Sequence, residues 1–341
     1  MNLQKLKDTA ARMLADDKGL LAMDESNPTA DKRFAALGIP QTAEMRRAYR
    51  DLIVNAKGLG DAIGGAILYD ETIRQTAHDG TPFAQALERA GIVPGIKVDA
   101  GAKPLAGHGG ELVTEGLDGL RGRLAEYAGM GVRFAKWRAV IAIDDAMDAP
   151  SRGCLEANAH ALARYAALCQ EAGIVPIVEP EVLMDGAHTL QRCSDVTERA
   201  LRALFDQLRT QRVRLEGTLL KPNMIVPGLR CATQEPADEV ADATVECFRR
   251  AVPAAVAGIA FLSGGQSAAD ASARLNAMNL RHRGALPWPV AFSFARAIQD
   301  PAMKAWGGRN ENVAVAQKAL VERAHLNRLA RRGEYTAAME A

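Results

Sequence analysis

Short apolar runs alternate along the chain with longer amphipathic segments. Runs of four to eight residues that are rich in Val, Ile, Leu and Phe are typical of strands buried on both faces. Each run is followed by a segment long enough for a helix, which is the order expected of βα units and a parallel sheet. The eight runs span residues 19–25, 65–71, 92–98, 132–138, 174–180, 215–221, 257–263 and 289–294.

The segments between the runs predict helices that cover the sheet. In residues 155–172 and 195–209, apolar side chains recur every three or four positions, which places them on one helix face. The polar residue that ends a run recurs after 27 to 46 residues, and no Pro- or Ser-rich linker interrupts the series. Eight units without a linker favour a (β/α)8 TIM barrel over an open sheet. We therefore expect an α/β protein with a single domain over residues 1–341.

Two further segments lie outside the eight units. Residues 3–15 form an amphipathic pattern before the first run, and residues 311–332 form a long, Arg-rich one after the last. Both patterns predict helices. The expected domain therefore carries an N-terminal helix at about 3–15, and a C-terminal helix with a short tail at about 311–341.

Composition and charge exclude several classes of protein. The 341 residues include 42 Lys and Arg and 41 Asp and Glu, for a formal charge of +1, so a nucleic-acid partner is not expected. The N-terminus lacks the apolar core of a secretory signal. The longest apolar stretch, 251–262, is broken by Pro253 and Gly258 and is too short to cross a membrane. We expect no membrane partner.

Cysteine and histidine spacing gives no sign of a metal or disulfide framework. The five cysteines are at least 15 residues apart, and the six histidines at least 28, so neither a CxxC pair nor an HExxH motif occurs. Isolated thiols suit a reducing compartment, and we expect a cytoplasmic protein. No GxGxxG follows a strand, which argues against a dinucleotide fingerprint. The expectation is therefore no metal and no cofactor.

Five charged residues lie near the C-terminal ends of these runs, where a strand buried on both faces should carry no charge. In a barrel these positions meet at the C-terminal rim, where active sites of this fold form. A lysine next to another cation loses its proton more easily, and the free amine can attack a carbonyl to form an imine. The residues alone favour a Schiff-base lyase or a transaldolase-type site, without selecting the nucleophile. The five residues are Asp24, Lys97, Lys136, Glu179 and Lys221.

The seventh run leads into a glycine-rich loop that suits phosphate. The loop Ser263-Gly264-Gly265 precedes a helical segment, and Arg296 follows the eighth run by two residues. Glycines let the backbone approach an anion, a helix N-terminus offers free N–H groups, and barrels bind phosphate after strands seven and eight.

The string LSGGQ at 262–266 also matches the signature of ABC-type ATPases. However, those proteins need GxxxxGK[ST], and the dipeptide Gly-Lys does not occur in this chain.

Seven segments of the chain match one known family: LAMDES (21–26), GIKVDAG (95–101), FAKWR (134–138), LARYAALCQEAGIVPIVEPE (162–181), LEGTLLKPNM (215–224), FLSGGQS (261–267) and KAWGG (304–308). On these segments, and from about residue 15 to 335, the chain resembles the class I, Schiff-base-forming fructose-bisphosphate aldolases. The resemblance implies a (β/α)8 barrel that reversibly cleaves fructose 1,6-bisphosphate to dihydroxyacetone phosphate and glyceraldehyde 3-phosphate, without a metal, in glycolysis and gluconeogenesis.

The resemblance also implies catalytic roles. Lys221 matches the imine-forming lysine, and Glu179 matches the general acid/base that helps to dehydrate the carbinolamine. Asp24 matches the carboxylate that accepts the proton of the C4 hydroxyl during cleavage. Lys136 matches a channel residue that favours the amine form of Lys221.

Further residues match the substrate-binding groups of the family. Arg138 lines the channel, and Glu181 supports Glu179. The phosphate on the dihydroxyacetone side is matched by Ser263, Gly264, Gly265, Ser293 and Arg296. The other phosphate is matched by Ser26, Arg33 and Lys97. The implied partners are a small phosphosugar and, as in relatives that are usually homotetramers, further copies of the chain.

The chain departs from the animal enzymes in three places. Asn27-Pro28 stands where they usually have Thr-Gly, which predicts a stiffer loop after Asp24, and Ala295 replaces a common glycine. Animal relatives also carry a longer tail whose final tyrosine assists proton transfer at the enamine. The sequence here runs to Ala341, and its last tyrosine is Tyr335. We therefore expect another group or water to serve that step.

Three alternatives remain at this point. Sedoheptulose-bisphosphate cleavage would use the same site. A barrel lyase could instead hold Mg²⁺ on Asp24 and Glu179, although a lysine-rich rim repels a cation. A non-catalytic scaffold on the aldolase fold would be expected to lack Lys221 or Glu179, and both are present.

Overall fold

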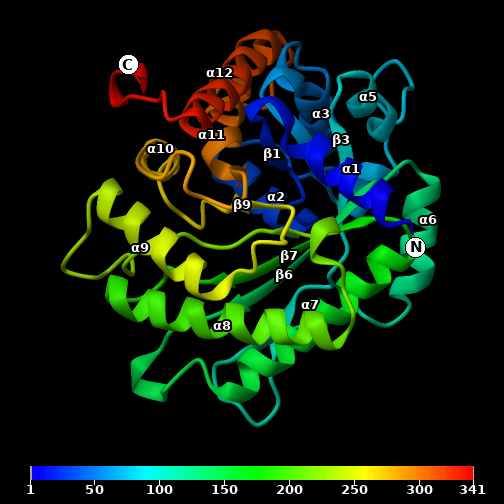
Figure 1. The fold of residues 1–341 in the computed structure, drawn as a ribbon. Coiled ribbons are helices and arrows are strands. Elements are labelled where there is room, and N and C mark those ends of the chain that lie inside the picture. The colour runs from blue at the N-terminus through cyan, green and yellow to red at the C-terminus, as the bar shows by residue number, and fades with distance from the viewer. Residues whose placement is uncertain (1, 341) are drawn as a thin grey trace.

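Within residues 2–340, which the computed structural model describes, eight parallel strands close into a barrel with helices around it (Figure 1). The order around the barrel is β1-β10-β9-β8-β7-β6-β3-β2. The predicted fold class is confirmed. The strands are β1 Gly19–Ala22, β2 Ile63–Leu68, β3 Val93–Lys97, β6 Phe134–Ile141, β7 Val175–Val182, β8 Leu219–Leu220, β9 Gly258–Phe261 and β10 Val290–Phe294.

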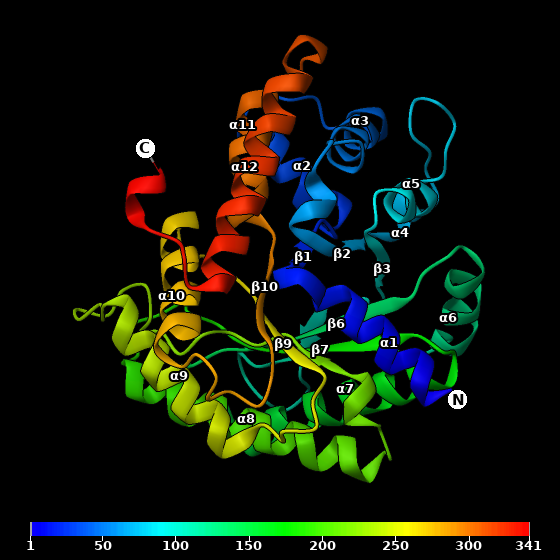
Figure 2. The ribbon, with the colours of Figure 1, turned by 45° about the horizontal axis from the view of Figure 1, so that its top comes forward.

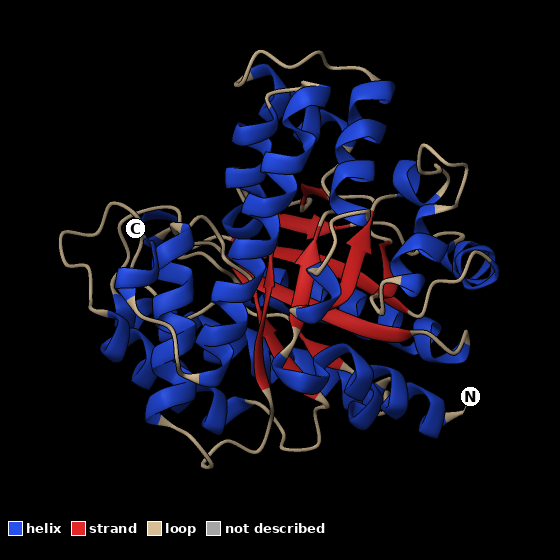
Figure 3. Ribbon diagram, turned by 90° about the horizontal axis from the view of Figure 1, so that it is seen from above, coloured by secondary structure: helices blue, strands red, loops and turns tan. Residues whose placement is uncertain are grey.

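Helices enclose the strands on the outside, as the view from above shows (Figure 3). No helix among residues 2–340 is both long and apolar enough to cross a membrane. The helices are α1 Leu3–Leu14, α2 Asn27–Ala35, α3 Ala43–Val54, α4 Asp70–Ile73, α5 Phe83–Arg89, α6 Leu120–Gly129, α7 Arg152–Glu171, α8 Leu190–Thr210, α9 Ala237–Ala251, α10 Ala268–Arg281, α11 Arg296–Trp306 and α12 Val313–Arg332.

Several boundaries differ from those expected from the pattern. The helices α7 and α8 begin three and five residues earlier than predicted, because Ser151 and Thr189 cap their N-termini with side-chain hydrogen bonds. The final helix, α12, begins after a 3-10 turn at Asn310–Asn312 and lies beside α11 (Figure 2). A small antiparallel hairpin, β4 Ala102–Pro104 with β5 Leu112–Thr114, was not predicted.

Alternate residues of β6 and β7 point into the barrel. Their side chains form successive layers along the barrel axis. Phe134 and Ile177 belong to an apolar layer near the N-terminal end. The polar residues two or more positions further along line a cavity above it. The expectation that Lys136 and Glu179 end their strands is wrong, since β6 continues to Ile141 and β7 to Val182. These charges are tolerated inside strands because each faces a partner of opposite charge.

The helix α1 closes the N-terminal end of the barrel. Its buried residues Leu6, Ala10, Met13 and Leu14 pack in one cluster with inward residues of the strands, from Leu20 in β1 to Ala291 in β10. The apolar layer thereby separates the cavity at the C-terminal end from solvent below. The cavity consequently opens to solvent at the C-terminal end of the barrel.

Close packing in this layer makes Gly95 of β3 sensitive to substitution. A Cβ on Gly95 would lie 2.2 Å from Cζ of the buried Phe134 ring, far inside contact distance. We expect Gly95→Ala to lower the free energy of unfolding by roughly 1–3 kcal/mol, the usual cost of overpacking a core. Urea denaturation measures it.

A matched control is Gly122→Ala in the interior of α6. A Cβ there would meet no atom within 4 Å, and alanine is the better helix former by about 0.5–1 kcal/mol. Gly122→Ala should therefore stabilise the protein or leave it unchanged. Equal effects of the two substitutions would contradict the packing described here.

Candidate active site

A cavity of about 800 Å³ opens at the C-terminal end of the barrel. Every site residue expected from the sequence lines it except Gly265, which nonetheless lies beside it: a Cβ on Gly265 would be 3.7 Å from Nη2 of Arg296. The lining residues that the sequence indicated are Asp24, Ser26, Arg33, Lys97, Lys136, Arg138, Glu179, Glu181, Lys221, Ser263, Gly264, Ser293 and Arg296.

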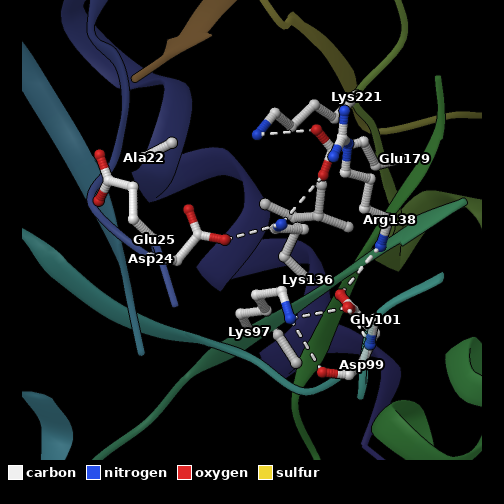
Figure 4. Close-up of polar contacts among 12 residues, drawn as sticks. Ala22, Asp24, Glu25, Lys97, Asp99, Gly101, Lys136, Arg138, Glu179 and Lys221 are labelled. Carbon is white, nitrogen blue, oxygen red and sulfur yellow. Dashed lines mark hydrogen bonds and ion pairs between the residues drawn. The ribbon is translucent and has the colours of Figure 1, made fainter. Parts of the chain in front are cut away.

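Four buried charges of alternating sign form the centre of the cavity (Figure 4). Lys136 Nζ lies 2.7 Å from Asp24 Oδ2 and 3.2 Å from Glu179 Oε2. The other oxygen of Glu179, Oε1, lies 3.1 Å from Lys221 Nζ. Asp24 follows β1 by two residues, Lys221 follows β8 directly, and Lys136 and Glu179 lie within β6 and β7. The barrel thus brings together residues that are up to 197 positions apart in the chain.

This alternation decides the protonation of Asp24, Glu179 and Lys136. Burial opposes ionisation of Asp24, but Lys136, followed by Lys221 and Lys97, outweighs it and lowers the pKa of Asp24 to about 2. Burial likewise opposes charge on Glu179, and the cations around it lower its pKa. For Lys136, burial favours the neutral amine, yet Asp24 and Glu179 raise its pKa. At neutral pH, both carboxylates are ionised and Lys136 is a cation.

The remaining cations from the middle of the barrel are also paired. Lys97 Nζ lies 2.7 Å from Asp99 Oδ1, and Arg138 forms an ion pair with Glu181. Asp99 additionally accepts hydrogen bonds from the backbone N–H groups of Gly101 and Arg138. Sequence reasoning missed Asp99, although it follows Lys97 by two residues within the GIKVDAG segment. The rim is therefore less positive than three unpaired lysines would make it.

One face of α2 forms a wall of the cavity. Ser26, Thr29, Lys32 and Arg33 all line it, at the three- and four-residue spacing of neighbours on a helix face. The Ser26 and Thr29 hydroxyl oxygens are 3.0 Å apart. Neither Thr29 nor Lys32 was expected from the sequence.

Two carboxylates fix the position of the Arg33 guanidinium in this wall. It forms ion pairs with Glu25 and, at 2.8 Å, with Asp300 of α11. Glu25 also accepts hydrogen bonds from Arg50 Nη2 at 2.8 Å and Gln299 Nε2 at 2.9 Å. Burial opposes the charge of Glu25, but Arg50 and Arg33 lower its pKa. Sequence reasoning missed Glu25, which directly follows Asp24.

The loop after β9 lines one part of the cavity. Gly264 and Gly265 adopt positive φ angles of 58° and 108°, which an L side chain rarely adopts. The loop leads into α10, and Ser267, which precedes that helix, caps its N-terminus. In β10, Ser293 is buried and its Oγ has no hydrogen-bond partner within residues 2–340. An unpaired buried hydroxyl at a glycine loop is suited to bind a phosphate oxygen.

Two cations in the lining have no carboxylate partner in the described part of the chain, namely Lys32 and Arg296. The other cations of the lining each contact a carboxylate. A ligand with two negatively charged groups would therefore neutralise charge that the protein leaves free.

The described residues contain no group of three or more His, Cys, Asp or Glu side chains placed to hold a metal ion. Between Asp24 and Glu179, where two carboxylates approach each other, the ammonium of Lys136 occupies the space.

Comparisons with known proteins agree across the whole chain. Residues 5–341 match a family model described as fructose-bisphosphate aldolase class-I. A probable fructose-bisphosphate aldolase class 1 of Xanthomonas axonopodis pv. citri is 54% identical over 336 residues, covering 98% of this chain and 99% of that protein. Fructose-bisphosphate aldolase C-B of Danio rerio is 49% identical, covering 97% of this chain and 91% of that protein.

A solved structure gives the same result. The fructose-bisphosphate aldolase of Plasmodium falciparum, crystallised in complex with TRAP and a small-molecule inhibitor, superposes with a TM-score of 0.96 at 44% sequence identity. The similarity covers 98% of this chain and 96% of that one. The likeness therefore extends over both the barrel and the loops that build the cavity.

The charge alternation predicts how the protein responds to loss of Lys136. Lys136→Met leaves Asp24 and Glu179 buried without their shared cation, so the free energy of unfolding at pH 7 should fall by about 3–5 kcal/mol. The pKa of Asp24 should rise from about 2, because burial then acts with less opposition. Urea unfolding as a function of pH measures both effects.

The sign of the pH dependence is specific. In the parent protein, the depressed pKa of Asp24 contributes stability above about pH 4, and that stability is lost as the pH falls toward 2. In Lys136→Met this carboxylate protonates at higher pH, which removes its unpaired charge. The stability difference between the two proteins should therefore shrink as the pH is lowered from 7 to 4. Lys136→Arg, which keeps the charge, is the control, and a constant difference across this range would contradict the assignment.

Proposed function

We propose a reaction for this chain from one premise: it belongs to the class I fructose-bisphosphate aldolase family and is therefore a carbon–carbon lyase. The proposed reaction is the metal-independent, reversible cleavage of fructose 1,6-bisphosphate to dihydroxyacetone phosphate and glyceraldehyde 3-phosphate, in glycolysis and gluconeogenesis. The observation that carries the mechanism is the 3.1 Å contact between Nζ of Lys221 and the ionised carboxylate of Glu179.

Glu179 acts first as a base and then as an acid. It takes a proton from the ammonium of Lys221, and the free amine attacks C2 of the ketose to form a carbinolamine. The protonated Glu179 then returns its proton to the carbinolamine hydroxyl, which leaves as water, and a protonated imine remains on Lys221. The lowered pKa of Glu179 fits this order, because the free enzyme must hold it ready to accept a proton.

Asp24 performs the next proton transfer. Its carboxylate accepts the proton of the C4 hydroxyl, and C4 becomes the carbonyl of glyceraldehyde 3-phosphate as the C3–C4 bond breaks. The bonding electrons move to C3 and are delocalised into the imine, forming an enamine. A proton from the Asp24 carboxyl or from water then returns to C3, and water hydrolyses the imine to release dihydroxyacetone phosphate.

Lys136 stabilises these steps by charge. It lies between Asp24 and Glu179, so it keeps both carboxylates ionised before reaction and remains a cation beside the imine. The ammonium position also disfavours a divalent cation between the two carboxylates and argues against the Mg²⁺-dependent alternative.

The substrate phosphates are proposed to bind at two places. Ser263, Gly264, Gly265, Ser293 and Arg296 bind the phosphate on the dihydroxyacetone side. At the wall formed by α2, the Ser26 hydroxyl and the cations Lys97 and Arg33 receive the other phosphate. Arg138 and Glu181 border the channel between them. Support for the first place comes from Ser293 Oγ and from the guanidinium of Arg296, which have no hydrogen-bond partner and no carboxylate partner, respectively, among residues 2–340.

By likeness to the family, we propose a homotetramer located in the cytoplasm. Four of the five cysteines are buried as free thiols, which suits a reducing compartment. Sedimentation equilibrium of the full chain would measure the oligomeric state, and a monomer mass would contradict the tetramer.

Trapping tests the identity of the nucleophile. Incubation with dihydroxyacetone phosphate and borohydride should reduce the imine and fix one adduct per chain, which intact mass counts and peptide mapping locates on Lys221. Lys221→Arg should abolish both the adduct and turnover, because a guanidinium stays protonated and cannot attack. Lys318→Arg, an exposed position on α12, should keep both. An adduct on Lys97 or Lys136 would reject the mechanism.

The phosphate assignment predicts a change in binding when Arg296 is removed. A charge-assisted hydrogen bond contributes about 1.5–3 kcal/mol, so Arg296→Ala should raise KM by roughly ten- to a hundredfold. Fructose 1-phosphate keeps the phosphate on this side and should be affected similarly. Arg309→Ala, outside the cavity, serves as the control. Unchanged KM values for both substrates would place this phosphate elsewhere.

A further inference from the structure

The α2 wall contains a cation, Arg33, that is already paired with carboxylates of the protein. Arg33 lines the cavity and its side chain is 14% exposed. Both nitrogens at the end of its guanidinium already contact carboxylates, Nη1 with Glu25 and Nη2 with Asp300. A substrate phosphate at this wall must therefore either share Arg33 with these carboxylates or displace one of them.

The two carboxylates differ in how firmly they are held. Glu25 is bound by Arg33, Arg50 and Gln299, and its side chain is 10% exposed. The side chain of Asp300 is 45% exposed, and within residues 2–340 its carboxylate contacts Arg33 alone. Displacing Asp300 would break one ion pair whose carboxylate is already open to solvent, and ion pairs that water screens are weak. Asp300 is therefore the partner that a phosphate can replace, while Glu25 keeps Arg33 at the wall.

The position of Asp300 connects this contact to the rest of the site. It lies in α11 four residues after Arg296, on the same side of the helix. The first phosphate is accounted for by the loop after β9, by Ser293 and by Arg296. The second phosphate of a bisphosphate thus depends on the α2 wall, where Asp300 competes with it for Arg33.

We propose that Asp300 is a specificity-determining residue for the reaction assigned above, on which this inference rests. It pairs with Arg33 in the free enzyme and so weakens binding of the second phosphate of a ketose bisphosphate. The chain consequently discriminates less between ketose bisphosphates and ketose 1-phosphates than it would without this carboxylate.

The first test compares two substrates. Exposed ion pairs contribute roughly 0.2–1 kcal/mol, so Asp300→Asn should lower KM for fructose 1,6-bisphosphate by about two- to fivefold. KM for fructose 1-phosphate, which lacks the second phosphate, should stay unchanged. Equal decreases for both substrates, or no decrease for either, would overturn the proposal. Asp242→Asn, which removes a surface carboxylate paired with Arg281, controls for the change in net charge and should not alter either KM.

A second test asks whether Asp300 acts through Arg33. In an Arg33→Gln background, the competition no longer exists, so adding Asp300→Asn should leave KM for the bisphosphate unchanged. The same two- to fivefold decrease in both backgrounds would mean that Asp300 acts by general repulsion of phosphate, which contradicts the proposal.

A binding measurement separates this inference from the proposed reaction. A hexitol 1,6-bisphosphate and a hexitol 1-phosphate have no carbonyl and cannot form an imine, so calorimetry with the parent chain and Asp300→Asn measures phosphate recognition alone. Tighter binding of the bisphosphate only, in Asp300→Asn, supports the role of Asp300 even if turnover is absent. Turnover of both sugars with unchanged relative affinities would leave the aldolase reaction standing and reject the role of Asp300.

Discussion

The shared ammonium of Lys136 is the interaction on which the site depends. Transferring one ionised group from water into a protein interior costs several kcal/mol, and the centre of this barrel contains four such groups. Lys136 offsets the cost by contacting two carboxylates at once, and Glu179 does so by contacting two lysines. Each interior member of the series thus has two partners of opposite charge. Removing Lys136 leaves Asp24 without its counter-charge in this series, and removing Glu179 does the same to Lys221.

The alternation of side chains along the strands makes this arrangement possible. Residues two apart in a strand both face the barrel interior. An apolar residue can therefore lie in one layer of the interior and a charged residue in the next. The register pairs Lys136 with Ile177 and Arg138 with Glu179, and Lys136 therefore reaches Glu179 diagonally. Below them, Phe134 and α1 exclude water from the floor of the cavity. The same apolar layer that stabilises the barrel thereby strengthens the electrostatic contacts above it.

The sequence predicted the barrel because strand runs and helical segments recur at regular spacing, and it predicted most of the cavity lining because long segments resemble one family. Strand ends were less predictable. In a hydrophobicity pattern, Lys136 and Glu179 appear to mark the ends of their strands. In the barrel, their charges are paired with opposite charges on neighbouring strands. The groups behind the lining were missed for a related reason. Asp300 contacts Arg33 across 267 residues, and neither position alone signals a pair, since a half-exposed Asp on a helix resembles any other surface residue.

The position of α1 has a consequence for the synthesis of the chain. Residues of α1 leave the ribosome before the strands that they cover, yet their apolar face packs against strands that extend to β10 near residue 290. Throughout most of translation, Leu6, Met13 and Leu14 have no completed surface to cover. Contacts between such distant segments also form slowly. Although α1 is made before the barrel strands, it is therefore among the last of these elements to dock. In the interval, its exposed apolar face is available to chaperones or to nascent chains on neighbouring ribosomes.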